Sequence, residues 1–217
     1  MARSRQAVVE PRKRRSNGEA SRQRILDAAA EIAGERGYEG TSINLVSERS
    51  GLPASSIYWH FNDKDALIAA VIDRSFERWS AALTEPGPFG DDATDDDVLH
   101  VGLRRTGAAL ASFPDFLRLG LLLILEQRPD ELTARARFMD ARHTTARGTA
   151  SLYRRVFPAF DEAAIDQLVT LTMALADGLF IASDAGEVEL DDAFDLMATA
   201  VLGAAERMRS ADPRVRR

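Results

Sequence analysis

The 217-residue sequence contains no cysteine, which excludes disulfide bonds, thiolate metal ligands and cysteine nucleophiles. Aromatic residues make up only 7% of the chain, and no two strand-like segments flank a hairpin turn, so little favours a β-sheet. The purely apolar runs, such as residues 121–125, are all far shorter than the roughly 20 residues that a transmembrane helix needs. The basic first residues are followed by no apolar stretch before Ile25, so no secretory signal is expected. These absences predict a soluble cytoplasmic protein.

Motifs for enzymatic chemistry are also missing. The three histidines, His60, His100 and His143, form no HExxH pair, and there is neither a phosphate-binding glycine loop nor a Gly-x-Ser-x-Gly turn. The acidic segment 91–97 lacks the glycine and the distal glutamate of a calcium-binding loop. It is interpreted as a solvated linker that places acidic residues at a helix N-terminus. We therefore expect no catalytic residues, no metal and no cofactor.

Charge is distributed unevenly along the chain. The net charge is −6, but residues 1–24 hold eight basic and two acidic residues, a net of +6, which leaves −12 for the rest. A basic segment on an acidic body can bind phosphates locally. A solvated, disordered tail is the other interpretation. The basic residues expected to contact DNA are Arg12, Lys13, Arg14 and Arg15.

Hydrophobic periodicity predicts three helices near the N-terminus. Residues 1–18 have little apolar content and are expected to form a flexible arm. An amphipathic helix should follow, with Ser21 as its N-cap and Gly37 as its stop. A second helix should begin near Thr41 and Ser42 and end at Gly51. A third should carry Pro53 in its first turn and run through Phe61.

The remainder is also predicted to be helical. One pattern begins at Lys64 and ends before residues 85–88, and further patterns cover about 97–112, 114–127, 130–156, 162–184 and 190–209. The fold class is therefore all-α, with about nine helices. The expected domains are the arm (1–18), a helix-turn-helix domain (19–65), an effector-binding and dimerisation domain (66–210) and a tail (211–217).

The second and third helices, joined through Gly51-Leu52-Pro53, have the spacing of a helix-turn-helix, in which the later helix enters the major groove. Ile57 and Phe61 lie four residues apart and can anchor the third helix to the core. Tyr58, Trp59 and His60 cannot all be buried, because consecutive helical residues point about 100° apart. At least one of these aromatic side chains should be exposed.

Residues 21–64 resemble the DNA-binding region of the TetR family of repressors. The resemblance rests on Arg24-Ile25-Leu26-Asp27-Ala28-Ala29, on Gly37-Tyr38-Glu39-Gly40-Thr41-Ser42, and above all on residues 51–64, GLPASSIYWHFNDK. It implies phosphate contacts from Thr41, Ser42, Tyr58 and Lys64. It implies that base edges or the adjacent backbone are contacted by Ala54, Ser55, Ser56, Trp59 and His60, with Asn44 and Pro53 also at the interface. Many members have Lys-Gly where this chain has Ala54-Ser55 and a basic residue at Asn44, so the arginine-rich arm is expected to contribute affinity.

Two late helices rich in small residues predict a four-helix dimer interface, although packing within one subunit would explain them too. Two reading helices about 34 Å apart would read a palindrome. The predicted interface residues are Leu168, Leu171, Leu175, Gly178, Leu196, Ala200 and Gly203.

The middle helices contain more apolar residues than one face needs, so they form either a plain core or a cavity for a small lipophilic effector. The expected pocket residues are Phe76, Trp79, His100, Phe116, Arg118, Glu126, Phe138 and His143. An effector that prefers a tilted helix 64–84 would move the two DNA-binding heads apart and release DNA, whereas one that tightens operator binding would be a corepressor.

The predicted function is thus a dimeric, ligand-responsive repressor that binds double-stranded operator DNA. The alternatives are an enzyme, which the missing motifs disfavour, and a helical adaptor or a DNA-architectural protein that binds without reading sequence. Comparing the protein's own promoter with random DNA at about 150 mM salt separates them.

Overall fold

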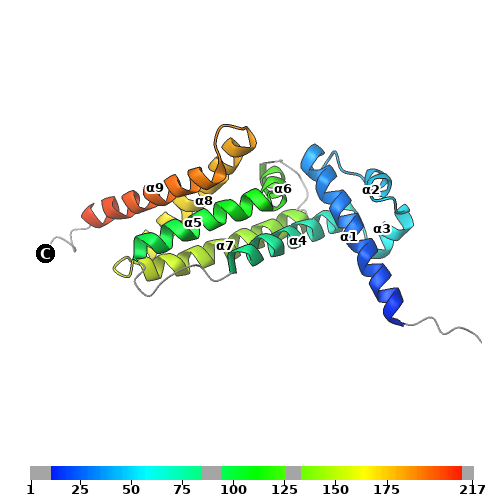
Figure 1. The fold of residues 1–217 in the computed structure, drawn as a ribbon, viewed down its shortest axis with the longest axis horizontal. Helices are drawn as coiled ribbons and strands as arrows, with labels where there is room; N and C mark the ends of the chain where they lie inside the picture. The colour runs from blue at the N-terminus through cyan, green and yellow to red at the C-terminus, as the bar shows by residue number, and fades with distance from the viewer. Residues whose placement is uncertain (1–10, 85–93, 126–132, 212–217) are drawn as a thin grey trace, which may run out of the picture.

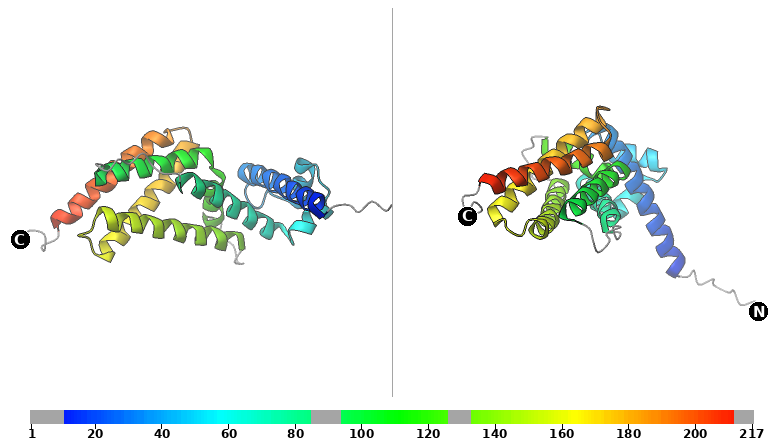
Figure 2. Two further views of the ribbon diagram at one scale, coloured as in Figure 1. Left: turned by 60° about the horizontal axis from the view of Figure 1, so that its bottom comes forward. Right: turned by 60° about the vertical axis from the view of Figure 1, so that its left-hand side comes forward.

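The computed structural model describes residues 11–84, 94–125 and 133–211. Over these ranges the chain forms nine α-helices and no strand, as the sequence predicted. Figures 1 and 2 show α1–α3 as a head at one end of the molecule, with α4 leading from it into the bundle of α5–α9. The helices are α1 (Pro11–Arg36), α2 (Ile43–Ser50), α3 (Ala54–His60), α4 (Lys64–Thr84), α5 (Asp95–Ser112), α6 (Asp115–Leu125), α7 (Thr133–Val156), α8 (Glu162–Asp184) and α9 (Leu190–Ala211).

Helix α1 begins at Pro11, ten residues before the predicted N-cap Ser21, and residues 11–18, predicted to be flexible, are helical. Ser21 is not an N-cap, because it lies inside the helix and its hydroxyl donates to the Asn17 carbonyl. Pro11 suits the first helical position, where a missing N–H costs nothing. The predicted end is confirmed: the helix stops at Arg36, and Gly37 has a φ of 68°. Residues 1–10 of the predicted arm lie outside the described residues.

Helix α4 connects the head to the bundle. At its start, the Asp65 carboxylate accepts hydrogen bonds from the backbone N–H groups of Thr133 and Ala134, at 2.8 and 3.2 Å, and so caps α7. Further along the helix, Arg74 forms an ion pair of 2.7 Å with Asp27 of α1. The predicted domain boundary between residues 65 and 66 therefore falls inside a continuous helix that both parts share.

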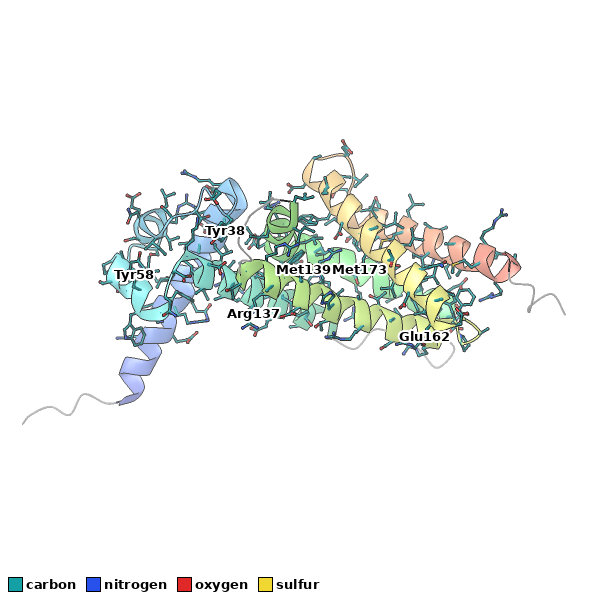
Figure 3. All side chains as sticks on the ribbon, turned by 180° about the vertical axis from the view of Figure 1, so that it is seen from behind. Tyr38, Tyr58, Arg137, Met139, Glu162 and Met173 are labelled. Carbon is teal, nitrogen blue, oxygen red and sulfur yellow. The ribbon has the colours of Figure 1, made fainter. Side chains whose placement is uncertain are left out.

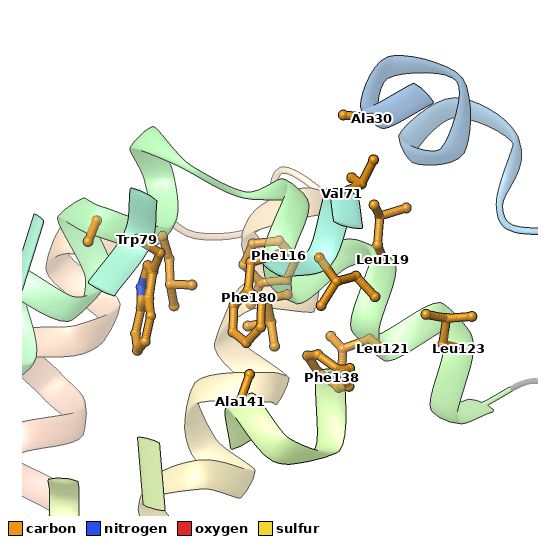
Figure 4. Close-up of a cluster of buried hydrophobic side chains, with 14 of the residues drawn as sticks. Ala30, Val71, Trp79, Phe116, Leu119, Leu121, Leu123, Phe138, Ala141 and Phe180 are labelled. Atoms are coloured by element: carbon orange, nitrogen blue, oxygen red, sulfur yellow. The ribbon is translucent and has the colours of Figure 1, made fainter. Parts of the chain in front are cut away.

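The bundle is built around aromatic side chains from several helices. Figure 4 shows Trp79, Phe116 and Phe138 within this cluster, and the Phe116 ring lies 5.3 Å from that of Phe138. A Cβ at Gly120 would lie 1.9 Å from the Phe138 ring, so only glycine allows α6 to approach α7 this closely. The core thus depends on one close helix contact as well as on apolar burial.

The acidic linker has the role that the sequence predicted where the structure describes it. Asp95, Asp96 and Asp97 occupy the first turn of α5. Thr94 is the N-cap and forms a capping box with Asp97. These carboxylates stabilise the positive end of the helix dipole.

Helix α8 is long and apolar enough to cross a membrane by composition, with a mean hydropathy of 1.5 over 18 residues, of which 28% are buried. The bent pair of α5 and α6 passes the same test. Core helices of soluble proteins also meet this criterion, so the finding carries little weight alone. It does show that α8 leaves apolar surface uncovered.

Candidate nucleic-acid interface

Helix α3 presents two large aromatic side chains to solvent. Ile57 is fully buried and Phe61 is 6% exposed, so one face of the helix is fixed to the core of the head. Tyr58 and Trp59 are 55% and 76% exposed, and Figure 3 shows Tyr58 on the outer side of the head. The prediction that at least one aromatic would be exposed is therefore confirmed. Exposure at this level provides no folding stability, which favours a role in recognition.

The turn between α2 and α3 is held by side-chain hydrogen bonds. Gly51 adopts a left-handed conformation, with a φ of 66°, which a side chain would strain. The Ser47 hydroxyl donates to the Leu52 carbonyl at 2.7 Å, and the Leu52 N–H donates to the Ser50 hydroxyl at 3.3 Å. Arg24 of α1 donates to the Ser50 carbonyl. These contacts fix the orientation of α3 relative to α1 and α2.

The N-terminus of α2 contributes a second exposed polar group. Ser42 is its N-cap and accepts a hydrogen bond from the Leu45 N–H at 3.3 Å, and Asn44 is exposed beside it. Thr41 was predicted to contact phosphate, but it is only 1% exposed and its hydroxyl donates to the Gly37 carbonyl. The Thr41 side chain therefore closes the preceding turn, and that prediction is corrected.

Most of the other predicted residues lie on the same surface as Tyr58 and Trp59. Pro53 and Ser55 are exposed, and Ala54, Ser56 and His60 are half-buried. Burial and the nearby Arg22 guanidinium lower the pKa of His60, so its ring is neutral at pH 7. The surface therefore offers hydroxyls, a neutral imidazole and ring edges instead of charge.

Lys64 was predicted to contact the DNA backbone, but in this structure its ammonium group faces the head itself. Its Nζ donates to the Tyr38 carbonyl at 3.1 Å, lies 4.2 Å from the centre of the Tyr38 ring, and is 3.7 Å from a Glu39 carboxylate oxygen. Lys64 would have to leave these partners to reach a phosphate.

The N-terminal part of α1 lies beside α3, which the sequence reasoning missed. A Cβ at Gly18 would lie 3.8 Å from the Trp59 ring. A shallow pocket of about 390 Å³ lies between the two helices and is lined by Asn17, Gly18, Ser21, Ser55, Ser56, Trp59 and His60. The signal that could have found it is Pro11, a residue common at the first position of a helix.

The basic residues Arg12, Lys13, Arg14 and Arg15 are part of the first turns of α1. Their side chains lie outside the described part of the structure, so their predicted DNA contacts stay a prediction. Their backbone, however, belongs to the helix whose next turns border α3. The basic cluster is therefore carried on a helix near the exposed face.

A cavity of about 510 Å³ lies in the bundle. Phe76, Trp79 and Phe116 of the predicted set lie on its wall. Phe138 does not line it but packs behind Phe116. The full lining is Phe76, Trp79, Ser80, Leu83, Gly102, Leu103, Thr106, Leu110, Phe116, Leu117, Arg142, Thr144, Thr145, Gly148, Thr149, Leu152, Thr172, Met173, Ala176, Asp177, Phe194 and Met197.

The predicted polar pocket residues lie elsewhere, because their helices turn them outward. His100 faces Asp195 of α9, with Nδ1 and Oδ1 3.1 Å apart, and His143 is exposed. Arg118 forms an ion pair with Asp184. Glu126 lies outside the described residues. The polar groups of the cavity instead come mainly from α5, α7 and α8.

Helices α8 and α9 together expose a stripe of small and apolar side chains. Leu196 and Ile181 are 68% and 52% exposed. A Cβ added at Gly178 or at Gly203 would meet no other atom within 4 Å. Of the other predicted interface residues, Ala200 is exposed, and Leu171 and Leu175 are half-buried. Leu168 is only 1% exposed and belongs to the subunit's own core, so its assignment to the interface is corrected.

Among the described residues, no three His, Asp or Glu side chains come together as a possible metal site.

A family model described as bacterial regulatory proteins of the tetR family matches residues 25–71. The HTH-type transcriptional regulator SrpR of Pseudomonas putida is 34% identical over 61 residues, which are 28% of this chain and 29% of that protein. An HTH-type transcriptional repressor of Mycobacterium tuberculosis is 34% identical over 71 residues, 33% of this chain and 38% of that protein. The matches thus span about a third of these relatives.

The similarity in fold extends over most of the chain. A putative tetr-transcriptional regulator from Streptomyces avermitilis superposes with a TM-score of 0.67 at 22% sequence identity, covering 86% of this chain and 98% of the other. At this identity the likeness concerns the fold alone. The sequence similarity is confined to the N-terminal part of the chain, whereas the structural similarity covers most of its helices. Both are similarities to tetR-type transcriptional regulators.

Proposed function

Because the chain belongs to the TetR family of transcriptional regulators and has its DNA-binding domain, we propose that it is a cytoplasmic repressor that binds a palindromic operator as a dimer. The observation that carries this proposal is the exposed pair Tyr58 and Trp59 on a reading helix whose other face is fixed by Ile57 and Phe61. A helix anchored in this way can enter the major groove without losing core contacts.

The DNA contacts are proposed to come from three places. The exposed part of α3 reads bases through Ser55, Trp59 and the neutral His60. Ser42, at the N-terminus of α2, and the exposed Tyr58 hydroxyl of α3 position the head on phosphates. The basic residues at the start of α1 add affinity from flanking phosphates.

The second half of the chain is proposed to bind an effector and to form the dimer. The 510 Å³ cavity is of the size that small-molecule sites have. The uncovered stripe of α8 and α9 suits an isologous four-helix interface. Residues 19–65 would then form most of the DNA-binding domain and residues 66–210 the regulatory domain.

Helix α4 is proposed to link the two functions. Phe76 and Trp79 lie on the cavity wall, while Arg74, two residues before Phe76, is paired with Asp27 of α1. An occupant that displaces the two aromatic rings therefore also moves a helix that is attached to the head. Release of DNA follows if the occupied conformation holds the heads at the wrong spacing.

The test is a binding titration of the full-length protein on its own promoter DNA and on random DNA at about 150 mM salt. A specific regulator should prefer the promoter by about 1,000-fold or more. Trp59→Ala should remove this preference, whereas Leu125→Ala, at a 71% exposed position in the bundle, should leave it unchanged. Equal binding to both DNAs would indicate an architectural protein, and no binding an adaptor.

A second titration tests the start of α1. Deleting residues 1–18 would also remove Gly18 from beside Trp59, so replacing the four basic residues 12–15 by glutamine is the cleaner change. Each lost phosphate contact should reduce the slope of log affinity against log salt by about 0.9. An unchanged slope would show that these residues do not contact DNA.

A further inference from the structure

Among the polar residues that line the cavity in the bundle, threonines outnumber charged residues. Thr106 of α5 and Thr145 and Thr149 of α7 all line it. The same cavity is lined by Phe76, Trp79 and Phe116, whose ring centres are 5.1 to 5.8 Å apart. The Trp79 indole N–H is buried without a hydrogen-bond partner, so it can donate to an oxygen of a ligand. Given the proposed role of this cavity as the effector site, its hydrogen-bonding groups define which ligands it can take.

The three threonine hydroxyls have already used their protons. Thr106 donates to the Gly102 carbonyl at 2.9 Å, Thr145 to the Ala141 carbonyl at 3.0 Å, and Thr149 to the Thr145 carbonyl at 3.1 Å. Each hydroxyl has one donor and two acceptor lone pairs. What these three groups offer to the cavity is therefore acceptor capacity.

Two further threonine hydroxyls on the lining each donate one hydrogen bond and accept one within the protein. Thr172 donates to the Leu168 carbonyl at 2.8 Å and pairs with the Tyr153 hydroxyl at 2.5 Å. Thr144 donates to the Asp140 carbonyl and accepts from Arg147. Ser80 also lines the cavity, and its hydroxyl can donate or accept. The acceptor capacity of the threonines is thus concentrated on Thr106, Thr145 and Thr149.

The charged groups of the lining neutralise each other. Arg142 donates to both carboxylate oxygens of Asp177, at 2.8 Å each, and the two side chains are only 18% and 21% exposed. A carboxylate ligand would compete with Asp177 for Arg142, and an ammonium ligand would compete with Arg142 for Asp177. Either exchange leaves a poorly solvated charge without its partner, which is costly.

We infer that the effector is an uncharged, largely apolar molecule that carries a hydrogen-bond donor, such as a phenol or a lipophilic alcohol. Its apolar body would pack on the aromatic wall, and its hydroxyl would donate to a threonine oxygen of α5 or α7. This inference rests on the proposed function of the cavity. It goes beyond it by excluding lipophilic acids and amines of the same size.

The test uses four compounds that share a biphenyl body: para-phenylphenol, its methyl ether, the para-carboxylate and the para-aminomethyl analogue. Calorimetric titration of the full-length protein without DNA should find para-phenylphenol bound about tenfold or more tightly than each of the others. Tighter binding of the carboxylate or the amine, equal binding of the ether, or no measurable binding of the phenol would each overturn the inference.

Two variants test whether the threonines of α7 cause the preference for the phenol over its ether. The double change Thr145→Val and Thr149→Val should reduce the preference for the phenol over its ether to about twofold or less, since valine has the same shape but no acceptor. Ser151→Ala is the matched control, because this hydroxyl donates to the Arg147 carbonyl on the same helix but is exposed. A phenol preference that persists in the double variant would contradict the assignment to α7.

Asp177→Asn tests the role of the ion pair. Freeing the Arg142 guanidinium should raise the affinity for the para-carboxylate by about tenfold or more. Unchanged affinity would show that the pair does not exclude anions. The ligand titrations contain no DNA, so their outcome does not depend on the outcome of the promoter titration. The ligand class and the repressor function are therefore tested separately.

Discussion

Replacing Leu196 by glutamate should separate the two subunits of the proposed dimer. Leu196 lies on α9 and is 68% exposed in the single chain. Ala200 and Gly203 follow it at intervals of four and three residues, so the three share one face of the helix. An exposed leucine in the middle of such a face has little reason to be there unless another surface covers it.

The magnitude follows from the area that is uncovered. Full burial of a leucine side chain stabilises by about 2 kcal/mol, and roughly two thirds of this side chain remains to be buried, which gives about 1.4 kcal/mol. A two-fold interface contains the residue twice, so about 3 kcal/mol is lost, or about a 100-fold increase in the dissociation constant. Desolvation of two carboxylates adds to this loss.

Sedimentation velocity over a range of micromolar concentrations measures the effect, with circular dichroism to verify the helical fold. Leu125→Glu is the matched control, since Leu125 is 71% exposed and belongs to α6, not to α8 or α9. The wild type and Leu125→Glu should sediment as dimers and Leu196→Glu as a monomer. A folded Leu196→Glu protein that dimerises as well as the control would refute the assignment of α8 and α9 to the interface.

Three further changes test the fold that supports the site. Gly120→Ala should lower the free energy of unfolding by about 2 kcal/mol or more in a urea titration, because its Cβ would overlap the Phe138 ring at 1.9 Å. Asp65→Asn should lower it by about 1 kcal/mol in the same assay, since the amide has one acceptor oxygen where the carboxylate uses two, so one of the two N–H groups of α7 loses its partner. Burial raises the pKa of Tyr153 to about 12. The contribution of Tyr153 to the free energy of unfolding should therefore be fully present below pH 10. It should fall between pH 10 and 12, where the unfolded chain ionises this phenol and the folded chain does not. Tyr153→Phe should remove this part of the alkaline loss of stability.

Helix α3 was predictable because its sequence signals are local. Gly51 ends α2 in a left-handed conformation, and Ile57 and Phe61, four residues apart, fix the buried face of α3. Once that face is known, the exposure of Tyr58 and Trp59 follows from helical geometry. No contact with a distant part of the chain is needed for this conclusion.

The start of α1 was missed because composition and helical structure are separate properties. Residues 11–18 have little apolar content, which favours a solvated segment, yet a basic helix needs an apolar stripe only where it meets another element. Helix α1 approaches α3 at Gly18, and because glycine has no side chain, the sequence shows no apolar residue at this contact. Thr41 was misplaced for a related reason, since a hydroxyl near a helix start can bond outward or back to its own turn.

The cavity shows where sequence reasoning stops. Phe76, Trp79 and Phe116 could be assigned to it because large apolar residues must point inward. Its polar members could not, because a half-polar helix such as α7 presents both His143 and Thr145 two positions apart, and only packing decides which faces inward. Each of Thr106, Thr145 and Thr149 donates its proton to the backbone carbonyl four residues earlier, which leaves the hydroxyl oxygen as an acceptor. The proposed ligand class therefore rests on hydrogen bonds within α5 and α7, and these become informative only after the fold shows that the threonines line a cavity.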